Sequence, residues 1–235
     1  MPEILHLDTE KIITGHTVYP PRVAFVTLGC KVNQSDTQRA MLDFRDAGFQ
    51  IVPACAPADV YIVNTCSVTH IADRKSRQWL RRGTHANPDA LIVATGCYAE
   101  SGYATLQNMP EVGLIVGYRE KESLLDIVLK QMPEYIPGTR RVTEPSAEES
   151  TPAWAGGEAE EYAEYRSRTR AMVKIEDGCN DFCTFCIIPF TRGMPRSTPT
   201  GAVVRQVQER LQDGFREIVL TGVHMGKYGQ DHAQR

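Results

Sequence analysis

No apolar run in this sequence approaches the roughly 18 residues that a membrane-spanning helix requires. The longest apolar stretches, residues 60–63 and 91–94, have the length of strands. The first 20 residues mix acids with bases and lack both a continuous apolar core and a small-residue cleavage site, so they do not resemble a secretory signal. We therefore expect no membrane association and a cytoplasmic location.

The sequence also lacks an even number of cysteines. Its seven cysteines cannot all be consumed by internal disulfides, which excludes the class of small disulfide scaffolds. In a reducing compartment, cysteines serve as metal ligands or catalytic thiols more often than as bridges. The 235 residues, 42% of them hydrophobic and 23% charged, are enough for one large folded domain or two small ones.

Positive charge is missing from one segment, residues 144–165. This segment contains seven glutamates, two prolines and two glycines but no lysine or arginine, which predicts an exposed acidic linker. Outside it, 26 basic residues face 22 acidic ones, so the net charge of −3 belongs to the linker. We expect the linker to separate one domain at residues 20–135 from a second at residues 168–235.

Short apolar runs alternate with helical patterns in the first domain. The runs are residues 23–28, 60–64, 91–95 and 112–116, and the helical patterns are one that begins at Asn33 or Ser35 and ends at Gly48, then residues 74–82, 99–106 and 121–130. This alternation predicts an α/β fold with a doubly wound parallel sheet. In the second domain, residues 171–175, 201–211 and 218–221 predict a single βαβ unit, which cannot close a sheet alone.

Three cysteines, Cys30, Cys66 and Cys97, each follow one of the apolar strands of the first domain. The carboxyl ends of parallel strands share the edge at which ligands bind, and neighbouring strands lie about 4.8 Å apart, so the three thiols can meet at one point. Three soft thiolates from separate loops suit an iron–sulfur cluster with one open iron better than zinc. The alternative is three small residues buried under the edge of the sheet.

A second group of cysteines is compact. Cys179, Cys183 and Cys186 form a C-x3-C-x2-C run, which supplies three thiolates where a cubane needs four, so one iron would take a non-protein ligand. The competing interpretation is a zinc knuckle without its fourth ligand. The apolar residues expected to exclude water from this loop are Phe182, Phe185, Ile187 and Ile188. We interpret the remaining cysteine, Cys55, as a buried structural thiol.

Five strings, four of which contain these cysteines, resemble signatures of the methylthiotransferase family of radical S-adenosylmethionine enzymes. They are TLGCKVNQSDTQ, NTCSVTHIADRKSRQ, TGCYAE, GCNDFCTFCIIPFTRG and LTGVHMGKYG, and the resemblance covers about residues 22–229. The residues after Cys30 and Cys66 look most like the branch that acts on threonylcarbamoyladenosine in tRNA. The alternatives are the isopentenyladenosine branch, the ribosomal-protein branch, and a non-catalytic iron–sulfur or RNA-binding module.

The resemblance implies two 4Fe–4S clusters. One cluster would be held by Cys179, Cys183 and Cys186, the catalytic cysteines, and its open iron would bind S-adenosylmethionine. An auxiliary cluster that carries sulfur would be held by Cys30, Cys66 and Cys97. Phe185 would lie near the adenine of S-adenosylmethionine, and Gly222 near its amino group.

In the family reaction, one S-adenosylmethionine methylates the sulfur. A second is cleaved to a 5′-deoxyadenosyl radical, which removes hydrogen from the adenine C2 before the methylthio group is inserted. The resemblance also implies a reductant protein as a partner, which the sequence does not identify.

Contacts with tRNA are expected from basic residues near the triads. Arg74, Arg77 and Arg81 fall on one helical stripe after Cys66, which either binds phosphates or is an ordinary solvated face. Arg192, after the second triad, is interpreted either as an RNA contact or as a partner of the cluster ligands.

The second domain is shorter than the family pattern. Members of the family complete a six-stranded partial barrel and then add a small β-rich RNA-binding domain, whereas residues 168–235 supply two barrel strands. We therefore interpret the chain as the N-terminal portion of such an enzyme with a truncated barrel. The strands that hold most of the S-adenosylmethionine pocket are not among its residues.

Overall fold

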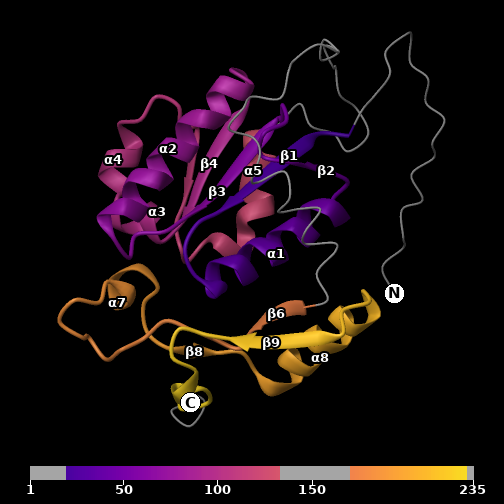
Figure 1. Ribbon diagram of the computed structural model, residues 1–235, viewed down its shortest axis with the longest axis vertical. Coiled ribbons are helices and arrows are strands. Elements are labelled where there is room, and N and C mark those ends of the chain that lie inside the picture. The colour runs from indigo at the N-terminus through magenta and orange to yellow at the C-terminus, as the bar shows by residue number, and fades with distance from the viewer. Residues whose placement is uncertain (1–19, 133–169, 232–235) are drawn as a thin grey trace.

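The computed structural model describes residues 20–132 and 170–231. The predicted acidic linker, residues 144–165, lies outside the described residues. Figure 1 shows the described parts as an α/β unit formed by the first range, with a smaller unit formed by the second range packed against its lower side.

The first unit is built on a five-stranded sheet in the order β2-β1-β3-β4-β5, and all four pairings are parallel. Its strands are β1 (Arg22–Thr27), β2 (Gln50–Val52), β3 (Val60–Thr65), β4 (Leu91–Gly96) and β5 (Leu114–Val116). This order is typical of doubly wound sheets, in which the direction of winding reverses between β1 and β3. The predicted parallel sheet is confirmed, and only the short edge strand β2 was not expected.

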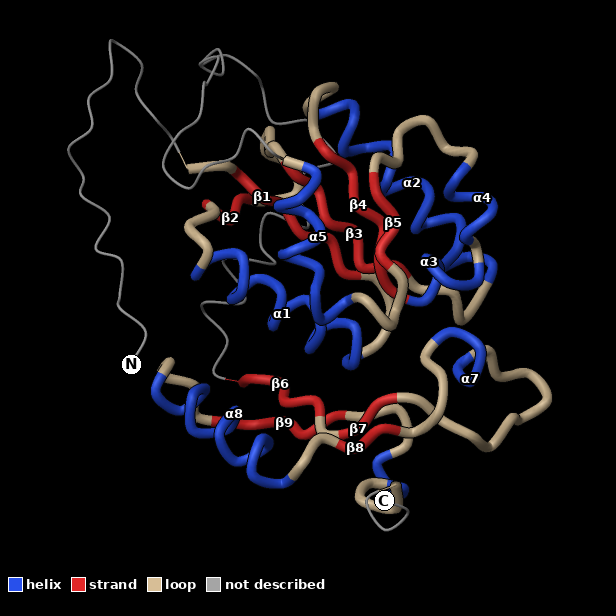
Figure 2. Tube along the Cα trace, turned by 180° about the vertical axis from the view of Figure 1, so that it is seen from behind, coloured by secondary structure: helices blue, strands red, loops and turns tan. Residues whose placement is uncertain are grey.

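Helices cover both faces of this sheet (Figures 1 and 2). One face carries α1 (Lys31–Asp46) and α5 (Leu124–Gln131), and the other carries α2 (His70–Ala86), α3 (Cys97–Ser101) and α4 (Tyr103–Gln107). Successive residues of a strand point to opposite faces, so Phe25 joins the core under α1 while Ala24 joins the core under α2. Because both faces are buried, the strands are continuous apolar runs rather than alternating ones.

Several helix boundaries differ from the predicted ones. Helix α1 begins directly after Cys30, and α2 begins at His70 because the Thr69 side chain accepts a hydrogen bond from the Ala72 N–H. The helix expected at residues 99–106 is interrupted at Gly102, where an added Cβ would collide with the ring of Tyr98. The helix expected at residues 121–130 opens with a 3₁₀ turn, η1 (Lys121–Ser123).

The second unit contains the predicted βαβ arrangement. Strands β6 (Arg170–Lys174) and β9 (Glu217–Thr221) pair in parallel and are connected through α8 (Thr200–Gln212) (Figure 2). The loop that carries the second cysteine triad contains three short elements that were not expected: β7 (Glu176–Asp177), α7 (Ile188–Thr191) and β8 (Arg196–Ser197). No helix in the described parts of the chain combines the length and the apolar character needed to cross a bilayer.

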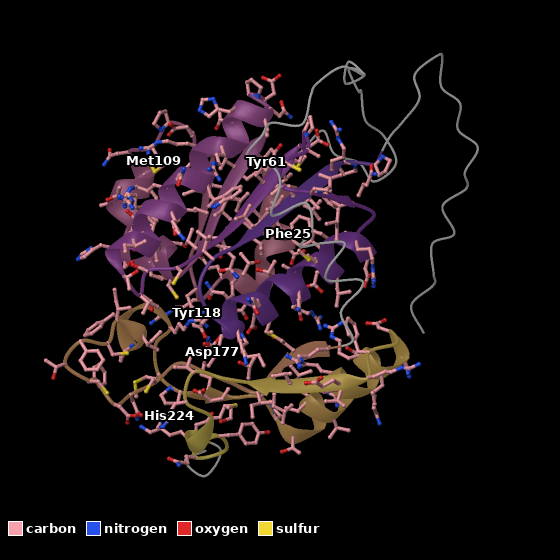
Figure 3. All side chains as sticks on the ribbon, viewed as in Figure 1. Phe25, Tyr61, Met109, Tyr118, Asp177 and His224 are labelled. Atoms are coloured by element: carbon pink, nitrogen blue, oxygen red, sulfur yellow. The ribbon has the colours of Figure 1, made fainter. Side chains whose placement is uncertain are left out.

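Tyr61, labelled in Figure 3, ties β3 to the loop that precedes it. Its hydroxyl donates a hydrogen bond to the Ala56 carbonyl at 2.6 Å and accepts one from the Ala58 N–H at 3.0 Å. Burial raises the pKa of Tyr61 to about 12. A tyrosine in the unfolded chain loses its proton near pH 10, so the stabilisation is complete below that pH and is lost as the pH rises toward 12.

We expect Tyr61→Phe to lower the free energy of unfolding by about 1 kcal/mol at pH 8, because two buried polar groups lose their partner. Between pH 10 and pH 12 the wild type should lose on the order of 2 kcal/mol more than the variant. Urea unfolding at pH 8, 10 and 11.5 measures both effects. Parallel pH dependences for the two proteins would contradict the assignment to Tyr61.

Candidate functional site

The first cysteine triad lies at the carboxyl edge of three neighbouring strands. Cys30 is the residue before α1, Cys66 directly follows β3, and Cys97 is the first residue of α3 after β4. A Cβ added to Gly29 would lie 2.7 Å from the Cys66 Sγ, so the loop after β1 passes directly against Cys66. The triad lies at the sheet edge that contains the switch point between β1 and β3, which is where doubly wound folds bind ligands.

The thiols of this triad share one electrostatic environment. Burial raises the pKa of the Cys66 thiol, the neighbouring Cys97 and Cys30 raise it further, and Arg192 lowers it. A bound metal would reverse this balance, because its positive charge favours the thiolate form of its ligands. Cys66 and Cys97 are buried and Cys30 is exposed, so the triad has one open side.

Asn33, in the first turn of α1, holds two of the cysteine loops together. Its side-chain amide donates to the Leu28 carbonyl at 2.7 Å and to the Thr65 carbonyl at 2.9 Å. These carbonyls stand just before Cys30 and Cys66. In return, the Asn64 side chain donates to the Asn33 carbonyl at 2.9 Å. Sequence reasoning missed this role, although Asn33 belongs to the string that follows Cys30.

The second triad lies in the loop of the smaller unit. The Cys179 N–H donates to the Gly193 carbonyl at 3.0 Å, and the Cys186 N–H donates to the Cys183 carbonyl at 2.9 Å, which closes a tight turn. Cys179 is buried, Cys186 is half-buried and Cys183 is exposed. All seven cysteines of the chain are free thiols. Neither set of three cysteines has all its sulfur atoms within 4.8 Å of one another in the described parts of the chain, so two cluster sites are inferred from the number and placement of the free thiols.

The apolar shell expected around the second triad is open in this structure. Phe185 is 95% exposed and Phe182 is 57% exposed, and only Ile187 and Ile188 are partly covered. Phe182 has a left-handed backbone with a φ of 47°, and its ring packs edge-on against the ring of Phe190. The phenylalanine rings thus form an apolar surface beside the cysteines rather than a seal over them.

The Gly-rich loop after β9 approaches the second triad. Donor atoms of Cys179, Asp181 and His224 all lie within 4.8 Å of one another, with His224 labelled in Figure 3, and Lys227 forms an ion pair with Asp181. Asp181 is exposed, and Lys227 lowers its pKa. Sequence reasoning assigned no role to His224, because a single histidine in a loop carries no spacing signal.

Gly222, expected near the S-adenosylmethionine amino group, lies against a buried carboxylate. A Cβ at Gly222 would be 3.0 Å from the Glu176 Oε2, and the same oxygen accepts a hydrogen bond from the His224 N–H at 2.7 Å. Burial raises the pKa of Glu176. The contact of Gly222 with S-adenosylmethionine stays a prediction.

The three arginines of the predicted basic stripe on α2 differ in exposure and in their partners. Arg74 is exposed, Arg77 is half-buried and donates to the Tyr98 hydroxyl at 2.6 Å, and the Arg81 guanidinium lies 3.6 Å from the Glu111 carboxylate. The interpretation of Arg192 as an RNA contact is wrong for this structure, because its side chain is 2% exposed and is held inside the protein.

Arg192 belongs to a buried ion cluster at the junction of the two units. We use the name junction cluster for its five members, Asp36, Lys121, Lys174, Asp177 and Arg192. Figure 3 labels Asp177 and Tyr118 at this junction. Asp177 lies 2.9 Å from Lys121, 2.8 Å from Lys174 and 2.7 Å from Arg192, and Asp36 pairs with both lysines.

The junction cluster has strong electrostatic coupling. Burial alone would raise the pKa of Asp177, but Lys174, Arg192 and Lys121 hold it well below its usual range. Arg192 is buried as well, yet Asp177 and Cys97 hold its pKa above the usual value. The junction cluster borders the first triad, because Arg192 donates a hydrogen bond to the Asn33 side chain, which also holds the loops of Cys30 and Cys66.

The fold and the site together define a class: an α/β protein that presents three thiols at the edge of a parallel sheet and a second set of three in an adjoining βαβ unit. Residues 22–117 match Uncharacterized protein family UPF0004. Over most of its length the chain is similar to methylthiotransferases, and the matched share of those proteins is consistent with an N-terminal portion.

The relatives agree with this placement. The chain is 41% identical to the threonylcarbamoyladenosine tRNA methylthiotransferase MtaB of Bacillus subtilis over 89% of the chain and 45% of that protein. It is 39% identical to MtaB of Aquifex aeolicus over 89% of the chain and 50% of that protein. It is 32% identical to the ribosomal protein uS12 methylthiotransferase RimO of Pectobacterium atrosepticum over 92% of the chain and 45% of that protein. The chain thus spans about half the length of these curated relatives.

Proposed function

We propose that this chain is the N-terminal portion of a radical S-adenosylmethionine methylthiotransferase that adds a methylthio group to C2 of N6-threonylcarbamoyladenosine in tRNA. The observation that carries the proposal is the arrangement of two sets of three free cysteines in adjoining units. The identity of 41% to a relative named for this tRNA substrate supports the choice of branch.

In this proposal the two cysteine triads hold clusters with different functions. Cys30, Cys66 and Cys97 would hold the auxiliary 4Fe–4S cluster, and the second triad would hold the catalytic one. When bound, the clusters and S-adenosylmethionine supply the radical chemistry that removes hydrogen from an unactivated carbon, which no side-chain acid or base can do. The chain itself supplies the thiolates and the backbone bonds that orient them. The exposed ring of Phe185 offers a surface for the adenine of S-adenosylmethionine.

Partners follow from the same proposal. A tRNA would approach the open side of the first triad, and the exposed Arg74 and Arg81 lie on α2, the helix that follows Cys66. Arg77 supports that helix through its bond to Tyr98 rather than reaching outward. A reductant protein would deliver electrons to the catalytic cluster, and the reaction would take place in the cytoplasm.

A second candidate function is the modification of a ribosomal protein, which the similarity to RimO supports. The nucleosides in the tRNA of a strain that lacks the gene distinguish these two functions. We expect the methylthio form of threonylcarbamoyladenosine to disappear from its digested tRNA, as measured by mass spectrometry. If that nucleoside persists in a cell with no other enzyme that makes it, the tRNA assignment fails.

The metal content tests the cofactors directly. After anaerobic reconstitution we expect about eight irons per chain in the wild type, and about four in Cys97→Ala and in Cys186→Ala, because each variant loses one cluster. Cys55→Ala is the matched control, since Cys55 lies in neither triad, and it should keep the wild-type iron content. Iron and zinc are measured by elemental analysis. A chain that binds no iron, or a single zinc, contradicts both cluster assignments.

A further inference from the structure

We propose that Arg192 is a positioning residue that fixes the two cysteine triads relative to each other, by joining Asn33 of the first unit to Asp177 of the second. This inference rests on the proposed function, in which the two metal centres act on the same substrate.

Arg192 stands at the end of α7, which follows the second triad, but its side chain reaches into the first unit. Its Nη1 donates to the Asp177 Oδ1 at 2.7 Å, and its Nη2 donates to the Asn33 Oδ1. Two donors of one planar guanidinium point in fixed directions, so the fork sets both the distance and the angle between its two partners. A side chain that is 2% exposed has little freedom to change this geometry.

Each partner of Arg192 in turn holds a cysteine loop. Asn33 donates to the carbonyls of Leu28 and Thr65, close before Cys30 and Cys66. Asp177 accepts a hydrogen bond from the Gly178 N–H at 3.0 Å, directly before Cys179. A continuous series of hydrogen bonds therefore runs from the loops of the first triad, through Arg192, to the start of the second.

The helices next to the two triads meet at the same place. Helix α3, which begins with Cys97, contacts α7, which follows Cys186. The lysines of the junction cluster pair with Asp36 and Asp177 but do not hydrogen-bond to Asn33 in the described structure. Arg192 is thus the member of the cluster that connects the carboxylates to the cysteine loops.

The test compares Arg192→Met and Arg192→Lys with the wild type. Methionine keeps much of the apolar volume and removes the charge, whereas lysine keeps the charge and loses the fork. Arg170→Met is the matched control, because Arg170 forms an exposed ion pair with Glu217 in the same unit. Asn33→Ser removes the other end of the same bond in case Arg192→Met does not fold. Because Asn33 also holds the Cys30 and Cys66 loops through the Leu28 and Thr65 carbonyls, the readout for this variant is Cys97.

The first readout needs no metal. In the cluster-free protein, alkylation of the buried Cys66 and Cys97 by a maleimide is followed by mass spectrometry. We expect labelling about tenfold faster in Arg192→Met and Asn33→Ser, because loss of the bridge opens the junction, and unchanged labelling in Arg170→Met. Labelling at the wild-type rate in all variants would overturn the proposal.

The second readout is the magnetic coupling between the two reduced clusters, measured by electron paramagnetic resonance. We expect Arg192→Lys to keep the wild-type iron content but to show altered coupling, which a merely stabilising residue would not produce. Wild-type coupling in Arg192→Lys would count against positioning by the fork. If the wild type itself binds no iron, the proposed function fails, and the labelling experiment still decides the role of Arg192.

Discussion

Replacing Gly96 with alanine is expected to lower the free energy of unfolding by at least about 3 kcal/mol and to abolish iron binding by the first cysteine triad. Gly96 has a φ of 88° and a ψ of −163°, a backbone conformation that is essentially confined to glycine. A Cβ at this position would lie 2.5 Å from the Thr65 carbonyl oxygen and against the Asn64 side chain. The backbone of Thr65 cannot shift without moving Cys66, and the backbone of Gly96 cannot shift without moving Cys97, because each cysteine is the next residue.

Gly214→Ala is the control for this prediction. Gly214 also has a positive φ, of 92°, but no heavy atom of the described residues lies within 4 Å of a Cβ placed there. Urea unfolding and iron content after reconstitution are measured for both variants. We expect Gly214→Ala to lose only the strain of about 1–2 kcal/mol and to keep its iron. Equal losses in the two variants would show that strain, rather than the collision with Thr65, determines the effect.

Replacing Asp177 with asparagine is expected to destabilise the junction of the two units by about 3–5 kcal/mol. Asp177 is buried and pairs with Lys121, Lys174 and Arg192. Without its charge, these three cations share only Asp36. Breaking a buried ion pair by removing one partner is costly, because the remaining charges stay buried without compensation.

The control for Asp177→Asn is Glu217→Gln, which removes one partner of an exposed ion pair with Arg170. Exposed pairs contribute about 1 kcal/mol or less, so this variant should be close to the wild type. Chemical unfolding measures the stability, and limited proteolysis shows whether the second unit separates from the first. An Asp177→Asn protein as stable and as resistant as Glu217→Gln would contradict the predicted role of the junction cluster.

Much of the fold follows from local patterns. The buried strands β1, β3 and β4 are continuous apolar runs, and the cysteine directly after each run could be placed at the shared edge of a parallel sheet from the sequence alone. The three-residue strand β2 was missed because its length is below that of a recognisable pattern. The start of α2 was placed four residues late because the capping Thr69 was not used as a helix signal.

The site was harder to predict where it depends on contacts between distant residues. Arg192 and Asn33 are 159 residues apart in the sequence, so no local pattern indicates that their side chains meet. An arginine near a metal-binding loop is more commonly exposed, and only the packing of the two units shows this one to be buried. The position of His224 beside Cys179 likewise depends on the pairing of β6 with β9.

The order of the strands has a consequence for synthesis. The cysteines of the first triad all precede residue 98, and the sheet that presents them is completed by Val116, whereas Asp177, Cys179 and Arg192 follow much later in the chain. Domains generally fold as units, with the N-terminal one first as the chain leaves the ribosome. The sheet can therefore bring its three cysteines to one edge before the second triad has been translated. The later segment would then dock through Arg192 against a sheet edge that has already formed.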